Sequence, residues 1–154
     1  MSINCEILDL KSKPTIIINT KIPQSRLDET KKNAYNTMYN YLKSIGKHNE
    51  SEFFIAYKSM GIENLDVDFG YILENEIESK NEIMKDELPS GKYVSGTYSG
   101  DYNKIESVYE ELMMYANEKG YETLGVIYEI DVNDQNKEEK RLKLMLPLKN
   151  KSKF

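Results

Sequence analysis

The sequence predicts an α+β fold: two βαββ repeats that form one curved antiparallel sheet, with two helices on one face and a ligand groove between the halves. The first observation is order, because strand, helix and two more strands occur twice within 154 residues. The second is that residues 34–46 align with residues 108–120 and share two tyrosines and the closing glycine, Tyr35/Tyr109, Tyr41/Tyr115 and Gly46/Gly120. Each repeat has one apolar helix stripe and one apolar sheet face to bury.

The first repeat is expected over about residues 3–75. An edge strand is predicted at Ile3–Leu10, and β-branched or alternating apolar residues predict three more strands, Thr15–Ile22, Phe53–Tyr57 and Val67–Leu73. Between them, apolar residues at helical spacing from Ala34 to Ile45 predict a helix that ends at Gly46. Ser25 with Asp28 predicts a variant of the capping box at its start.

The second repeat is expected over about residues 89–149, after a charged linker of about residues 76–88 that holds a short helix. Lys92–Thr97 predicts a strand, Asp101 a helix cap and Gly120 the end of the following helix. Gly125–Val132 and the alternating leucines of residues 142–148 predict the last two strands. The whole chain, residues 1–154, is expected to be a single domain.

Composition restricts the class of protein. A net charge of -5 argues against general nucleic-acid binding. A single cysteine, Cys5, forms no internal disulfide and indicates a reducing compartment. With neither a signal peptide nor a long apolar run, we expect a soluble cytoplasmic protein with no membrane contact. His48 has no Cys or His near it in the sequence, so neither a metal nor another cofactor is predicted.

Charge is uneven along the chain. Nine acidic residues lie between Glu63 and Glu87, and seven Lys or Arg residues lie between Lys137 and Phe154. Both runs are interpreted as solvated surface; the acidic run is the alternative contact for a protein partner.

Four segments resemble the GyrI-like small-molecule-binding domain, the effector-binding domain of multidrug-responsive transcription regulators: FFIAYKSM from Phe53, LPSGKYVSGTYSGDY from Leu88, VIYEIDV from Val126 and RLKLMLPL from Arg141. The resemblance covers Glu6 to Leu148. Two departures concern ligand preference. Tyr98-Ser99 stands where many members carry a His, and Lys140-Arg141 replaces an acidic residue of the last strand. Because no helix-turn-helix segment precedes the domain, the resemblance implies a stand-alone member.

By its motif, the glutamate of this family maps onto Glu129, in an apolar strand. A carboxylate in an apolar groove is costly unless compensated, and a lipophilic cation with aromatic walls compensates it. Tyr57, Tyr71 and Tyr93 are the candidate walls, and strand alternation places Ile127 beside Glu129. The alternative is that Glu129 is an exposed strand residue. Tyrosines at helical spacing, among them Tyr109, are interpreted as core or half-buried packing. The pair Met113-Met114 is interpreted as core packing.

Three functions follow. The first is binding of amphipathic, cationic or aromatic small molecules, as a sensor or sequestering protein without turnover. The second, implied by some stand-alone relatives, is a hydrolase that opens strained cyclopropane rings of DNA-alkylating compounds, with Glu129 as the catalytic residue that activates water. The third is a protein-interaction inhibitor of DNA gyrase. We favour the first.

Overall fold

The computed structural model describes residues 3–60, 63–132 and 141–151. Its contacts divide the chain into two compact units: unit 1 is Met1–Lys11 with Ser90–Phe154, and unit 2 is Ser12–Pro89. Each unit combines one α-helix with antiparallel strands, which confirms the α+β class and the repeated order of elements.

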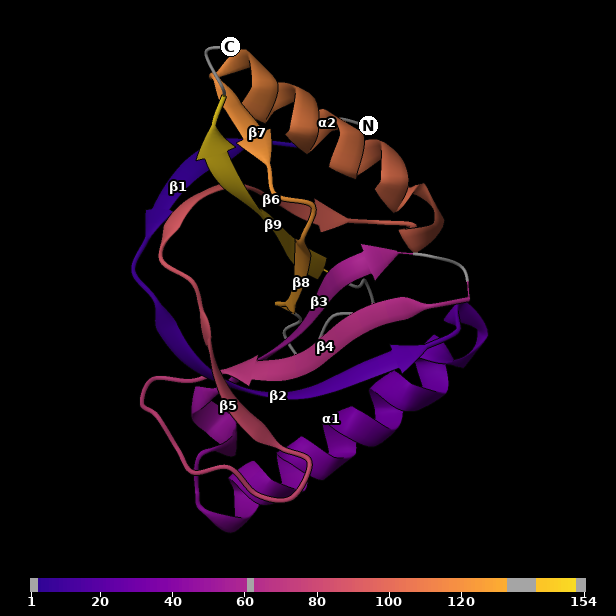
Figure 1. The fold of residues 1–154 in the computed structure, drawn as a ribbon, viewed down its shortest axis with the longest axis vertical. Helices are drawn as coiled ribbons and strands as arrows, with labels where there is room; N and C mark the ends of the chain where they lie inside the picture. Colours follow the sequence, from indigo (N-terminus) through magenta and orange to yellow (C-terminus); the bar gives the residue numbers. More distant parts are fainter. Residues whose placement is uncertain (1–2, 61–62, 133–140, 152–154) are drawn as a thin grey trace. The chain divides into compact units, whose positions relative to one another are not determined.

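Unit 2 has the strand order β5-β2-β4-β3, and every pairing is antiparallel. Its strands are β2 (Lys13–Ile22), β3 (Glu52–Met60), β4 (Leu65–Ile72) and β5 (Met84–Leu88). Helix α1 (Leu27–Ser44) lies against β4 and buries Ala34, Met38 and Leu42 at helical spacing (Figure 1).

The start of α1 differs from the prediction. A 3-10 turn, η1 (Gln24–Arg26), comes first, and Arg26 at the N-cap makes no side-chain cap bond, so the capping box at Ser25 and Asp28 is wrong. Asp28 lies in the first turn instead, where the helix dipole favours an acidic side chain. The end is as predicted: Gly46 has φ 73°, and Lys47 N–H donates to the Leu42 carbonyl.

The short helix expected between the repeats is also wrong, because residues 84–88 form strand β5 along β2. A tight turn at residues 80–83, with Asn81 at φ 52°, leads into it. β2 pairs with β4 along one edge and would present unpaired backbone groups along the other. β5 satisfies these groups, a requirement of the sheet that the charged sequence does not reveal.

Unit 1 has the strand order β1-β6-β9-β8, again antiparallel. Its strands are β1 (Glu6–Leu10), β6 (Gly91–Ser99), β8 (Ile127–Asp131) and β9 (Arg141–Asn150), with the short β7 (Tyr121–Thr123), which the sequence did not predict, on the end of β9. Helix α2 (Ile105–Glu118) lies against β6 and β7 (Figure 1). Asp101 caps the 3-10 turn that leads into α2 (η3, Tyr102–Lys104), where its Oδ1 accepts from Asn103 N–H at 2.9 Å. The N-cap of α2 itself is Lys104, which makes no side-chain cap bond.

The two units are built to one plan, so their positions can be matched. The buried helix residues Ala34, Met38 and Leu42 correspond to Val108, Leu112 and Ala116. In the sheets, β4 carries the row Ile18–Phe69–Ile55 and β9 the row Gly96–Leu144–Glu129, with Phe69 and Leu144 both 0% exposed. Glu129 therefore occupies in unit 1 the place that Ile55 occupies in unit 2.

Candidate functional site

Glu129 is a buried carboxylate in the middle of strand β8. Its side chain is 4% exposed, so the alternative of an exposed strand residue is excluded. Residues paired across neighbouring strands share a sheet face, so Glu129 points to the same side as Leu144 and Gly96. A hydrogen bond from Tyr109 of α2 to Glu129 places this face of the sheet toward the helix.

Two tyrosines hold the carboxylate. Tyr109 lies on the buried face of α2 and donates its hydroxyl to Glu129 Oε2. Tyr102 lies in the η3 turn, and its hydroxyl is 2.9 Å from both Oε1 and Oε2. The two donors differ in accessibility: Tyr109 is 7% exposed and Tyr102 39%. The carboxylate is thus closed on one side by the core and on the other by a tyrosine that reaches solvent.

Both of these donors are phenol hydroxyls. They supply hydrogen bonds that offset part of the desolvation of the carboxylate, but they bring no positive charge. The arrangement has two chemical uses. It can attract a cation to an apolar place, and it can take a proton from a water molecule while a phenol donates a hydrogen bond to a developing negative oxygen.

The sequence reasoning missed both tyrosines. Tyr109 was interpreted as core packing, because its spacing fits the buried stripe of the helix, and Tyr102 was not considered. A signal existed: the two tyrosines are seven residues apart, close to two helical turns, so both can project from one side of the helix entry.

Unit 2 shows what the same positions do without a carboxylate. Tyr35, the counterpart of Tyr109, packs against the rings of Phe53 and Tyr71, with centroids 5.0 and 5.8 Å away. Ile55 stands where Glu129 would be and is 5% exposed. A carboxylate at this place is therefore not required to build a βαββ unit of this kind.

The other predicted site residues do not all share a face with Glu129. Ile127 is buried on the same face by alternation. Tyr93 pairs with Pro147 and lies on the opposite face, where its ring meets Tyr128 at 6.3 Å. Burial, with a smaller effect of Tyr128, raises the pKa of Tyr93 to about 12. Tyr57 and Tyr71 belong to unit 2, where both are buried on the face of β3 and β4 that α1 covers.

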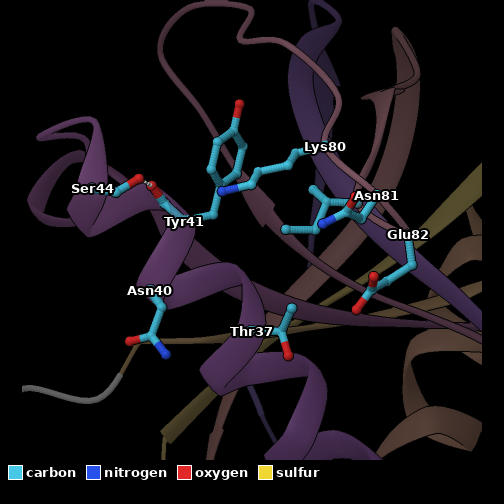
Figure 2. Close-up of a pocket in the computed structure, with 8 residues that line it drawn as sticks. Thr37, Asn40, Tyr41, Ser44, Lys80, Asn81 and Glu82 are labelled. Atoms are coloured by element: carbon cyan, nitrogen blue, oxygen red, sulfur yellow. Dashed lines mark hydrogen bonds between the residues drawn. The ribbon is translucent and has the colours of Figure 1, made fainter.

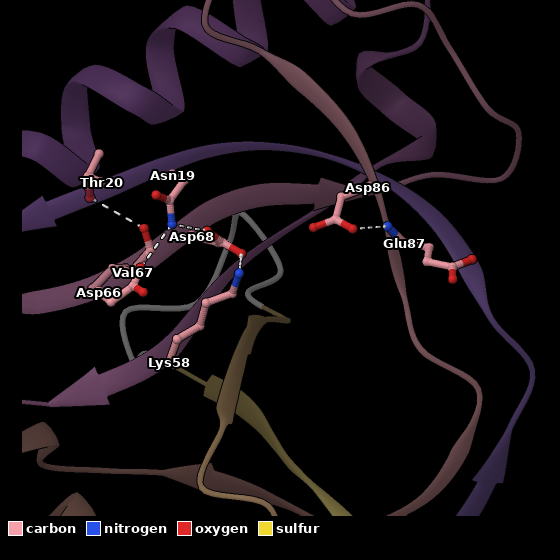
Figure 3. A network of polar contacts seen from close by, with 8 residues as sticks. All are labelled: Asn19, Thr20, Lys58, Asp66, Val67, Asp68, Asp86 and Glu87. Atoms are coloured by element: carbon pink, nitrogen blue, oxygen red, sulfur yellow. Dashed lines mark hydrogen bonds and ion pairs between the residues drawn. The ribbon is translucent and has the colours of Figure 1, made fainter.

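A second buried carboxylate, Asp68 of β4, lies on the opposite face of unit 2. It is 3% exposed and accepts from Asn19 Nδ2 at 2.6 Å, while Lys58 Nζ lies 3.0 Å from its other oxygen (Figure 3). Lys58 stands at a β-bulge in β3. Its hydrogen bond to Asp68 raises the pKa of Lys58, against the effect of burial. This carboxylate is compensated within the fold, as a structural ion pair is.

Unit 2 also has an open pocket of about 240 Å³ between α1 and the turn before β5 (Figure 2). Lys80 Nζ lies 5.5 Å from the centre of the Tyr41 ring in its wall, and the Tyr41 hydroxyl donates to the Glu78 carbonyl. It contains none of the predicted site residues. Within the described ranges, no cluster of three or more His, Cys, Asp or Glu side chains could hold a metal, and no helix could span a membrane.

The family model of the GyrI-like small molecule binding domain matches residues 3–149. Among solved structures, the EcmrR C-terminal domain superposes with a TM-score of 0.73 at 16% identity, covering 98% of this chain and 100% of that one. In the EcmrR–DNA complex, the TM-score is 0.79 at 16% identity over 97% of this chain, which spans only 58% of EcmrR. Among curated proteins, no sequence match was found.

Two further structures have the same fold. A hydrolase from Listeria innocua has a TM-score of 0.70 at 9% identity, covering 96% of this chain and 93% of that one. SAV2435 bound to tetraphenylphosphonium has a TM-score of 0.60 at 12% identity, covering 95% of this chain and 94% of that one. At these identities the likeness shows the fold alone.

Proposed function

Since the chain belongs to the GyrI-like small molecule binding domain family, we propose that it binds amphipathic, cationic small molecules and that Glu129 is their counter-ion. The observation that carries the proposal is the burial of this carboxylate, 4% exposed, at a position where the matching unit has an isoleucine. Burying a carboxylate costs free energy that packing does not require here. Binding a cation is a use that offsets the cost.

Access to the carboxylate is proposed to run past Tyr102. Its hydroxyl bonds both carboxylate oxygens, and it is the more exposed of the two donors. A rotation of this side chain would open one side of Glu129 while Tyr109 keeps its bond from the core. The ring of Tyr102 could then lie against the ligand, adding a cation–π attraction of about 0.5–2 kcal/mol.

The choice of a lipophilic cation has support outside this chain, since SAV2435, which has the same fold, was solved bound to tetraphenylphosphonium. Binding without turnover would make the present protein a sensor or a sequestering protein.

The test compares a cation with a neutral molecule of similar shape. Tetraphenylphosphonium and neutral triphenylphosphine oxide are titrated calorimetrically into the wild type, Glu129→Gln and, as a control, Glu122→Gln, which removes a half-exposed carboxylate of the same unit. We expect Glu129→Gln to weaken binding of the cation at least tenfold, which is about 1.4 kcal/mol, and to weaken binding of the neutral compound much less. An equal loss for both compounds would remove the counter-ion role.

A second candidate is hydrolysis of a strained cyclopropane ring conjugated to a carbonyl group. Glu129 would take a proton from water as the new C–O bond forms and a ring C–C bond breaks, and a tyrosine hydroxyl would stabilise the enolate oxygen that receives the electron pair. Glu129 would then return the proton to the enolate, which completes the addition of one water. The close contact of one carboxylate with two phenols favours this reading. Mass analysis after incubation decides: a compound with one water added indicates the enzyme, and an unchanged compound indicates the binding protein.

A further inference from the structure

Unit 1 has an open groove, about 370 Å³ in volume, between α2 and β7. Its walls are Met113, Met114 and Asn117 of the helix and Tyr121, Glu122 and Thr123 of the strand. The two methionines were predicted to pack in the core, but they are 40% and 65% exposed. Single exposed apolar residues are ordinary on a protein surface, but these two lie next to each other and line one groove.

The matching place in unit 2 carries no methionine. Tyr39 and Asn40 of α1 correspond to Met113 and Met114, and α1 is followed by the 3-10 turn η2 (His48–Glu50) and has no strand equivalent to β7. A βαββ unit of this kind is therefore stable without methionines or a groove at this place. Both features are particular to unit 1.

Charge around the groove indicates what it accepts. Helix α2 carries four glutamates and no lysine or arginine, whereas α1 carries two acidic and three basic residues. Glu110 and Glu118 are exposed on α2. Lys149 pairs with Glu122 at 3.8 Å on the strand side. The methionines of the groove thus belong to an acidic helix.

We propose that this methionine groove docks a basic, amphipathic segment of a partner protein, with large apolar side chains against Met113 and Met114 and Lys or Arg near the glutamates of α2. Methionine suits this role because its flexible, polarisable side chain adapts to different apolar partners. A second copy of the chain is disfavoured as the occupant, since a two-fold contact would bring one acidic helix against another.

The probe is a fluorescein-labelled peptide of leucine and lysine in an amphipathic helical pattern, with a leucine–glutamate peptide of the same pattern for comparison. Anisotropy is measured with the wild type, with Met113→Ser/Met114→Ser and with Met84→Ser, a control that changes a 55% exposed methionine of unit 2. We expect the cationic peptide to bind the wild type and to bind the double variant at least tenfold more weakly. Its affinity for the Met84→Ser control should equal its affinity for the wild type. Thermal unfolding of all three should match, because the changed side chains are exposed.

Four outcomes would overturn the proposal. The first is that the wild type does not bind the cationic peptide up to about 100 µM. The second and third are that the double variant binds this peptide as tightly as the wild type, or that the wild type binds the anionic peptide as tightly as the cationic one. The fourth is that the wild type sediments as a dimer and the double variant as a monomer. A Glu110→Lys/Glu118→Lys variant tests separately how much the charge of α2 contributes to peptide binding. It should weaken binding of the cationic peptide and strengthen binding of the anionic one. The absence of either change would contradict recognition of the peptide by the glutamates of α2.

Discussion

The carboxylate of Glu129 depends on hydroxyl groups that differ in burial, and this difference determines what each one contributes. A buried group that loses a hydrogen-bond partner bears its full desolvation cost, whereas near the surface water replaces the partner. Tyr109 lies in the core and Tyr102 is 39% exposed. The core tyrosine should therefore matter for stability, and the exposed one for access to the site.

We predict that Tyr109→Phe lowers the free energy of unfolding by about 1–3 kcal/mol and that Tyr102→Phe lowers it by less than about 1 kcal/mol. Urea unfolding monitored by circular dichroism measures both. Tyr98→Phe, which removes a partly buried hydroxyl that donates to the Asp101 carbonyl in the same unit, is the matched control. Equal losses for Tyr109→Phe and Tyr102→Phe would contradict the division of roles.

Tyr93 supplies a prediction in alkaline solution. Its ordinary pKa of 10.0 is raised to about 12 in the fold, chiefly by burial. Between these values the unfolded chain has lost the proton while the folded protein keeps it, so the unfolded state binds fewer protons and stability falls as pH rises. The loss attributable to Tyr93 is at most about 3 kcal/mol. Tyr93→Phe should show a shallower decline in urea midpoint above pH 10, and parallel declines would argue against the raised pKa.

Much of each element was predictable, and the failures have physical causes. Periodicity gave both helices and most strands, because burial of one face dominates their free energy. Periodicity did not predict β5 or β7. Both strands are short, and they form because their backbone groups pair with the edge of a neighbouring strand. The resemblance of its strand pointed to Glu129 as a candidate. The seven-residue spacing of Tyr102 and Tyr109 could place both on one side of the helix entry, but helical spacing describes a buried face and not what a hydroxyl meets there.

At the scale of an element, Gly70 of β4 is required by close packing. A Cβ built there would lie 2.5 Å from the Ile16 carbonyl oxygen and 2.7 Å from the Phe54 ring. The backbone of β2 cannot move aside without disturbing its pairing, so we predict that Gly70→Ala lowers stability by about 2–4 kcal/mol. Thermal unfolding measures the change.

The matched variant is Gly96→Ala in β6, where the first contact is the flexible end of the Ile3 side chain at 2.6 Å. We expect a smaller loss there. A second comparison, Gly70→Ala with Phe54→Leu, should recover only part of the loss, because the Ile16 carbonyl remains. Full recovery would show that ring crowding alone required the glycine.

At the scale of the whole molecule, the repeated plan makes one unit a control for the other. Phe69 and Leu144 occupy equivalent central places, and the helices bury equivalent residues, so the shared positions report on folding. We have proposed functions for the positions where the units differ: a carboxylate in place of Ile55, and methionines in place of Tyr39 and Asn40. Both differences lie in unit 1, one inside it and one on its surface.

This plan leads to a prediction that separates folding from binding. Glu129→Ile combined with Tyr109→Phe gives unit 1 the aliphatic side chain of unit 2 and removes the hydroxyl that would lose its acceptor. Replacing a buried charge by a well-packed apolar side chain is commonly neutral or stabilising, so the free energy of unfolding should stay level or rise by about 1–2 kcal/mol. Binding of tetraphenylphosphonium should fall below detection in calorimetry, because the counter-ion is gone. A double variant that unfolds several kcal/mol more easily would instead make Glu129 a structural residue, and one that still binds the cation as tightly as the wild type would place the ligand elsewhere.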